Sequence, residues 1–300
     1  MTNNLKFAMA LLVIGLAAVC AMAQAPTLRI QTDDPNLPSD LFYGNVKVKP
    51  LRLRPGTNQP ITIDDSDFFV QQHYIDFLNR MPDPGGFAAW LNVLGTCSGD
   101  TTQCDRIHVS GNFFQSPEFQ GRGYFVYRFY PVSFANVQGS DPSGYGHKPD
   151  FTQFMRDLRS ISGFLTDPQL EAAKVAFINS FMARPAFVAR FGSLNNTQYV
   201  DTLLNTANAG ISASTRQLLI DGLNNSTLTR AQVLRQVAES TEVYNRYYNP
   251  AFVIMQYFGY LRRDPDGAYF VWIDVLNANP ADSRHMIDGF MNSTEYRGRF

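Results

Sequence analysis

The chain has 300 residues, 25 of them basic and 26 acidic, and its formal net charge is −1. This balance, without long runs of one sign, excludes the basic surface of a nucleic-acid-binding protein and a polybasic membrane patch. The length suffices for one large domain or two smaller ones.

Residues 1–23 are typical of a secretory signal peptide. Lys6 is followed by the apolar run 7–19, and Ala21 and Ala23 occupy the positions that a signal peptidase recognises. Cys20 raises the alternative of a lipid anchor, which we disfavour because Val19 precedes it. No later segment approaches the ~20 apolar residues that span a bilayer, so we expect no transmembrane segment after cleavage. The sequence predicts a periplasmic, extracellular or cell-surface protein.

Cleavage at this site leaves Cys97 and Cys104, separated by a short polar loop. An exported protein matures where disulfides form, so we expect these two residues to be bonded. The alternative is a metal site, but with His108 as the nearest further ligand the set for zinc is incomplete. We therefore predict no metal and no cofactor.

Residues 24–65 contain six prolines among short alternating runs such as 46–49, 51–54 and 61–63. A period of two predicts strands, whereas proline restricts them to sheet edges or extended linkers. We interpret this segment as an extended arm, with a small β appendage as the alternative.

From Ser66 onward the apolar residues follow a helical period. Four segments begin with an aromatic residue and a valine, at Phe69, Phe125, Tyr199 and Phe252. Four further segments share a spacing that we count from one reference residue, the anchor. Apolar residues lie seven and three positions before the anchor, and an arginine lies six positions after it. The anchors are Ser116, Arg184, Ser240 and Ser293, and the arginines are Arg122, Arg190, Arg246 and Arg299. This recurrence predicts an all-α array of two to four related three-helix units, at 66–123, 124–192, 193–248 and 249–300, with the two middle units divergent.

The first and fourth units share a further motif, in which an arginine and an aspartate precede a glycine and a tryptophan. Asp83 and Trp90 belong to the first copy, and Asp266 and Trp272 to the second. We predict that the aspartates cap helices and that the tryptophans belong to the core of each unit.

These residues resemble the bacterial domain-of-unknown-function 4214 family. The resemblance rests on the motif from Phe68 to Trp90 and on Asn112 to Phe119, and it recurs from Phe252 to Tyr296. A weaker likeness, to the helical linker domains of phycobilisomes, rests on Ser293 to Phe300. The resemblance implies an all-helical, exported or surface-associated protein, and it assigns no catalytic residue.

Two interpretations of the four arginines stay open. In the first, each guanidinium pairs with a carboxylate or with helix carbonyls inside its own unit. In the second, the arginines form a ladder that binds an acidic glycan or the carboxylates of a partner. We favour the first. His73 and Asp76, three residues apart, are expected to form a helix-surface pair rather than a metal site.

No catalytic motif is present in the sequence. We therefore predict a non-enzymatic structural or protein-interaction protein of the cell surface or periplasm, whose partner is an envelope protein or a glycan. The alternative is a carbohydrate-binding module that uses Trp90 and Trp272 to stack sugars.

Overall fold

The computed structural model describes residues 53–54, 56–57, 59–97, 101–134 and 148–300, and the backbone of three short strands nearer the N-terminus. The chain divides into two units, residues 1–50 and 51–300. In the first unit β1 (Leu28–Gln31), β2 (Asp40–Tyr43) and β3 (Val46–Lys47) form an antiparallel sheet in the order β1-β2-β3. The predicted signal peptide, residues 1–23, lies outside the described residues.

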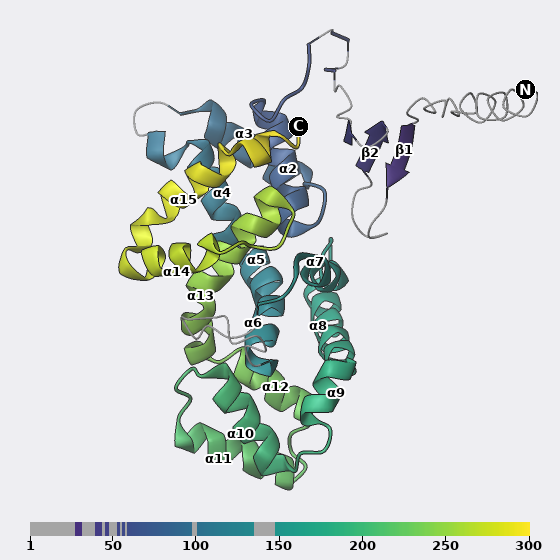
Figure 1. Cartoon of the computed structure of the whole chain (residues 1–300), viewed down its shortest axis with the longest axis vertical. Coiled ribbons are helices and arrows are strands. Elements are labelled where there is room, and N and C mark those ends of the chain that lie inside the picture. The colour runs from purple at the N-terminus through teal and green to yellow at the C-terminus, as the bar shows by residue number, and fades with distance from the viewer. Residues whose placement is uncertain are drawn as a thin grey trace, which may run out of the picture. The chain divides into compact units, whose positions relative to one another are not determined.

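Residues 51–300, the second of these two units, are helical where the structure describes them, as predicted. The exception is an isolated bridge between Leu53 and Pro60. The elements of this unit follow in chain order (Figure 1): α2 (Ser66–Leu78), α3 (Pro84–Gly95), the 3-10 turn η1 (Thr101–Gln103), α4 (Arg106–Gln115), α5 (Pro117–Gly121), α6 (Gly123–Ser133), α7 (Phe151–Ser160), α8 (Asp167–Met182), α9 (Pro185–Phe191), α10 (Asn196–Ala207), α11 (Ala213–Asn224), α12 (Arg230–Ala238), α13 (Thr241–Gln256), the π-helical turn η2 (Tyr257–Leu261), α14 (Ala268–Ala278), the 3-10 turn η3 (Pro280–Asp282), α15 (Ser283–Met291) and α16 (Thr294–Arg297).

All four anchor residues lie at the start of a helix. The hydroxyls of Ser116, Ser240 and Ser293 accept hydrogen bonds from the backbone N–H three residues later, at 3.1, 3.3 and 3.1 Å. These bonds satisfy N–H groups that have no partner inside the helix. Arg184 precedes α9 without a side-chain capping bond. The anchor spacing therefore marks a helix boundary in each case.

Helix α6 lies at the centre of the helical unit. Every residue from Gly123 to Ser133 is buried. It packs against α5, α7, α10, α12 and α13, which Figure 1 shows around it. A helix that is buried on all sides is stable only when neighbouring elements cover each side.

A second group of contacts joins helices that are distant in sequence. α2 packs against η2, and α4 packs against α15, so that the C-terminus lies close to α2 (Figure 1). The ring centroids of Phe77 and Tyr260 are 5.3 Å apart in an edge-to-face arrangement. The Ser110 and Tyr260 hydroxyls share a buried hydrogen bond.

The predicted boundary between units 193–248 and 249–300 falls inside a continuous helix. α13 runs from Thr241 to Gln256 and contains Pro250. Proline removes one helical N–H donor, but no glycine stands near it to end the helix. The short final helix of one predicted unit and the first helix of the next are therefore one element.

Two glycines mark close approaches of the chain. At Gly123, where the other three copies of the spacing have an aromatic residue, a Cβ would lie 2.4 Å from the Phe119 ring. At Gly259 a Cβ would lie 2.6 Å from the Phe77 ring, because α2 approaches η2 closely there. Neither position has room for a side chain.

We predict that Gly259→Ala lowers the free energy of unfolding by about 1–3 kcal/mol, because the methyl group forces Phe77 to move. Gly289→Ala in α15 is the matched control, since a Cβ there has no atom within 4 Å. That substitution should raise stability by up to about 1 kcal/mol. Urea denaturation followed by circular dichroism measures both values. Equal effects of the two substitutions would contradict the close approach.

Candidate functional site

The most buried ion-pair network in the described residues is centred on Asp76 of α2. Its side chain is 3% exposed and accepts hydrogen bonds from Nη1 and Nη2 of Arg299, both at 2.9 Å. Arg262 donates to the same carboxylate at 3.2 Å. Nη1 of Arg299 also donates to the carbonyls of Gly259 and Tyr260, at 3.0 and 2.7 Å. One carboxylate thus joins α2 to η2 and to the residues that follow α16.

Two further arginines form matching clamps at the ends of α2 and η2. Nε and Nη2 of Arg80 donate to the two carboxylate oxygens of Glu118 at 2.7 and 2.6 Å. Nε and Nη2 of Arg263 donate in the same way to Glu295, at 2.6 and 3.0 Å. Such two-point bonds fix both direction and distance. Each clamp therefore ties the end of a unit's first helix to its short last helix.

The aspartates of the shared motif lie beside these clamps. Asp83 accepts from the backbone N–H of Gly86 at 2.7 Å and caps α3, as predicted. Asp266 differs, because the capping position of α14 is Gly267. Its carboxylate accepts from the Tyr257 hydroxyl at 2.9 Å and from the Ala268 N–H at 3.0 Å.

Both aspartates are held in the ionised form. The N–H bond from Gly86 lowers the pKa of Asp83. Burial alone would raise the pKa of Asp266, but its bonds from Tyr257, Ala268 and Arg263 lower it overall. A lowered pKa suits a helix cap, whereas a general acid needs a raised one.

The recurrent arginines reach beyond the predicted units. Arg122 donates to Glu118 at 2.9 Å and to the Gly163 carbonyl at 2.7 Å, and Arg190 donates to the Thr206 hydroxyl at 2.8 Å. Arg246 is half-buried, with its guanidinium carbon 5.6 Å from the centroid of the Tyr247 ring. Arg122 and Arg299 make bonds of the kind that the favoured interpretation expected inside their own predicted units, to Glu118 and to the Gly259 and Tyr260 carbonyls. Arg122, Arg190 and Arg299 also contact residues of other predicted units.

The tryptophans lie on the middle helices and are half-buried. Trp90 on α3 stacks on Phe113 at a centroid distance of 5.7 Å. Trp272 lies on α14 beside Val271, whose side chain is 62% exposed. None of the residues of α3 is buried, although the helix contains no charged residue. The two tryptophans are therefore not fully enclosed core residues.

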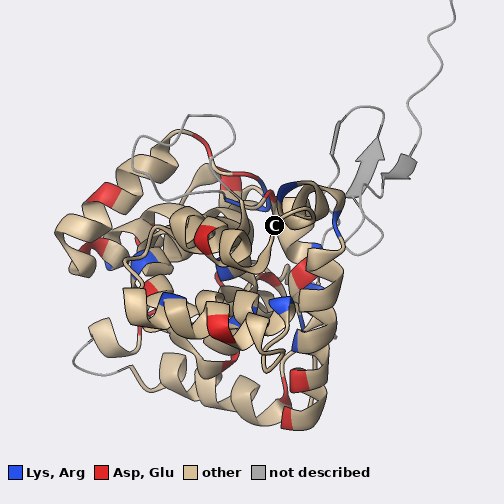
Figure 2. Cartoon of the chain, turned by 90° about the horizontal axis from the view of Figure 1, so that it is seen from below, with Lys and Arg blue, Asp and Glu red and all other residues tan. Residues whose placement is uncertain are grey.

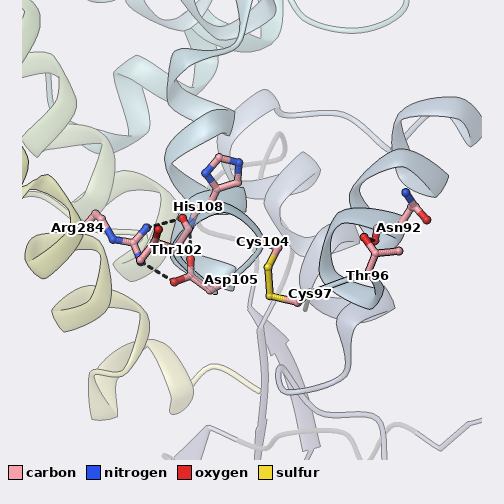
Figure 3. The surroundings of a disulfide bond; sticks show 8 residues. All are labelled: Asn92, Thr96, Cys97, Thr102, Cys104, Asp105, His108 and Arg284. Atoms are coloured by element: carbon pink, nitrogen blue, oxygen red, sulfur yellow. Dashed lines mark hydrogen bonds and ion pairs between the residues drawn. A yellow bond between two sulfur atoms is a disulfide. The ribbon is translucent and has the colours of Figure 1, made fainter. Parts of the chain in front are cut away.

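Cys97 and Cys104 form the predicted disulfide, with their Cα atoms 5.3 Å apart. Figure 3 shows the bond between the end of α3 and the start of α4, with Arg284 of α15 pointing toward Asp105. Arg284 donates to Asp105 and, at 3.2 Å, to the Thr102 carbonyl. The disulfide loop is thereby fastened to α15.

The prediction that His73 and Asp76 form a surface pair is wrong. The two residues are 1% and 2% exposed. Nδ1 of His73 contacts the Phe69 carbonyl at 2.9 Å, and the ring lies among Phe77, Phe113 and Tyr260. Burial lowers the pKa of His73 to about 4, which keeps the ring neutral.

Within the described ranges no group of three or more histidine, cysteine, aspartate or glutamate side chains is placed to hold a metal ion. The same ranges contain no helix long and apolar enough to cross a membrane. Figure 2 shows basic and acidic residues interspersed along the helices of the described chain.

Sequence reasoning missed the residues that organise this network. Asp76 was assigned to the surface, and Arg80, Arg263, Glu118 and Glu295 were given no pairing. A signal was present, because both arginines occupy the same place in the shared motif and both glutamates follow a serine anchor by two positions. The comparisons with known proteins found no matching family model, curated protein or solved structure.

We predict that Asp76→Asn lowers the free energy of unfolding by about 3–5 kcal/mol, because it leaves two partly buried arginines without a carboxylate. Asp201→Asn is the control. Asp201 pairs with Arg216 at the surface, where the side chains are 38% and 37% exposed. The urea concentration at which half of the Asp201→Asn variant is unfolded should stay close to that of the unmodified protein. A small effect at Asp76 would show that the network does not hold the fold together.

His73 makes stability depend on pH. Its folded pKa, about 4, lies below the unfolded value of 6.5, so its contribution is complete above pH 6.5 and is lost as the pH falls toward 4. The loss should reach about 3 kcal/mol. Urea denaturation of the protein and of His73→Met across this range gives the difference. Leu218→Gln, at a position that is 70% exposed and carries no titratable group, should leave the pH profile unchanged.

Proposed function

We propose that this is an exported, non-enzymatic protein that binds a protein partner through the largely apolar helices α3 and α14. The observation that carries the proposal is the pair of matching clamps, Arg80 with Glu118 and Arg263 with Glu295. Each clamp fixes the helices on either side of an apolar middle helix that bears a half-buried tryptophan. The middle helices are thus held in place while part of their apolar surface stays accessible.

The proposal includes four related helical units at 66–123, 124–192, 193–248 and 249–300. The matching clamps, the four anchors at helix starts and the aromatic-valine helices support it. Arg122, Arg190 and Arg299 link neighbouring units. The resemblance to the domain-of-unknown-function 4214 family fits this arrangement, and the predicted signal peptide and the disulfide fit an exported protein.

The chemistry of α3 favours an apolar partner surface. The helix contains no charged side chain, and no residue in it is buried. Exposed apolar surface of this kind typically binds the apolar face of another protein rather than an acidic glycan. The disulfide at its C-terminal end limits how far α3 can move toward any partner.

The test uses glutamate substitutions at exposed positions, where the fold tolerates them. Ala89→Glu on α3 and Val271→Glu on α14 should abolish crosslinking to a partner in intact cells, with unfolding midpoints unchanged. Leu218→Glu on α11 is the matched control, because that residue is 70% exposed and lies away from both helices in sequence. Unchanged crosslinking in the first two variants, or equal loss in the control, would refute the proposal.

A carbohydrate-binding module is the second candidate, and the partial exposure of Trp90 and Trp272 favours it. Exposed aromatic rings are the surfaces on which sugars stack. A glycan array probed with the protein and with Trp272→Ala separates the two candidates. Binding that is lost in the variant would support the sugar site, whereas no binding in either would remove it.

A further inference from the structure

Arg128 of α6 is a buried cation without a matching anion. Its side chain is 7% exposed, and it makes no hydrogen bond or ion pair with any residue that the structure describes. Of its nitrogen atoms, Nε is fully buried and has no partner. A buried charge in a protein is normally paired, so an unpaired one requires an explanation.

Two tyrosines flank this guanidinium. Its central carbon lies 4.8 Å from the ring centroid of Tyr124 and 5.5 Å from that of Tyr244. The Tyr124 hydroxyl is already used, because it donates to the Tyr244 carbonyl. The Tyr244 hydroxyl donates to Gln120 at 3.0 Å. The rings offer their faces to the cation, but neither hydroxyl neutralises its charge.

Two more cations lie close by, over the ring of Phe125. The Lys174 ammonium of α8 is 4.6 Å from the ring centroid, and the Arg235 guanidinium of α12 is 5.9 Å from it. Phe125 precedes Arg128 by three residues on α6, so the three cations gather around one helix.

The carboxylates of this region are both taken by Arg235. Its Nε donates to Glu239 at 2.7 Å, and its Nη1 and Nη2 both donate to Glu171. Lys174 makes no ion pair within the described ranges. Among the described residues, these three positive and two negative charges leave an excess of one positive charge, located at Arg128 and Lys174.

The pKa shifts of Arg128 and Lys174 agree with an excess of positive charge at these two side chains. Burial lowers the pKa of Arg128, and Glu239 and the two tyrosines only partly oppose it. Burial also lowers the pKa of Lys174, where Glu239 and Glu171 raise it and Arg235 and Arg128 lower it further. An anion placed between the two side chains would relieve both effects.

We propose that Arg128 and Lys174 form a binding site for the carboxylate group of a small ligand, framed by Tyr124 and Tyr244. The guanidinium donates two parallel hydrogen bonds to the carboxylate, and the Lys174 ammonium supplies a second positive charge. A single negative charge neutralises the local excess, whereas a phosphate dianion exceeds it. The site is independent of the partner surface on α3 and α14.

Isothermal titration calorimetry of the full chain with sodium acetate and sodium glucuronate, at constant ionic strength, tests the site. We expect saturable binding of both carboxylates. Arg128→Met and Lys174→Met should each weaken it by about tenfold or more, because each removes a hydrogen bond to a charged group. Arg216→Met is the control and should bind as the unmodified protein does, because Arg216 pairs with Asp201 instead.

Thermal unfolding without ligand provides a second measurement. Removing an uncompensated buried charge should leave Arg128→Met at least as stable as the unmodified protein. Lower stability of Arg128→Met, together with unweakened carboxylate binding by Lys174→Met, would show that Arg128 serves to stack on the tyrosines and would overturn the proposal. Absence of saturable binding, or tighter binding of inorganic phosphate than of either carboxylate, would also overturn it.

Discussion

The buried carboxylate of Asp76 is the interaction on which the rest of the helical unit depends. It is shared by Arg262 and Arg299, and the additional positive charge is stabilised by the carbonyls of Gly259 and Tyr260. These bonds have a favourable geometry only if α2 lies close to η2. That distance explains why residue 259 is glycine and why Phe77 packs edge-on against Tyr260. A buried ion pair contributes specificity only when its geometry is satisfied, and here the packing satisfies it.

The two matching clamps, Arg80 with Glu118 and Arg263 with Glu295, differ from the Asp76 network and from each other in how far solvent reaches them. Arg80 and Glu118 are 10% and 21% exposed, whereas Arg263 and Glu295 are 37% and 45% exposed. The same connectivity is therefore stronger in the first copy than in the fourth, because solvent screens exposed charges. The clamps connect the first helix of each unit to its short last helix, and α3 and α14 keep part of their surface exposed.

The sequence predicted well those features that residues close together in the chain form. The helix starts at the serine anchors, the cap at Asp83 and the disulfide between Cys97 and Cys104 all depend on residues within a few positions of one another. The pairing of Arg299 with Asp76 spans 223 residues, and periodicity contains no information about such distances. His73 was misplaced for the same reason, since its enclosure depends on Tyr260 from another part of the chain. The strands of residues 28–47 were only partly anticipated, as an alternative to an extended arm.

The contact between Asp76 and Arg299 also constrains the order in which the protein folds. A chain that leaves a ribosome or a translocation channel from its N-terminus exposes α2 long before residue 299 follows. Until then the Asp76 carboxylate has no Arg299, and the apolar face of α2 has no η2 against which to pack. Contacts of such sequence separation slow folding and leave apolar surface exposed meanwhile. The packing of α2 against η2 and its bonds to Arg299 can therefore be completed only after the last residues have been synthesised.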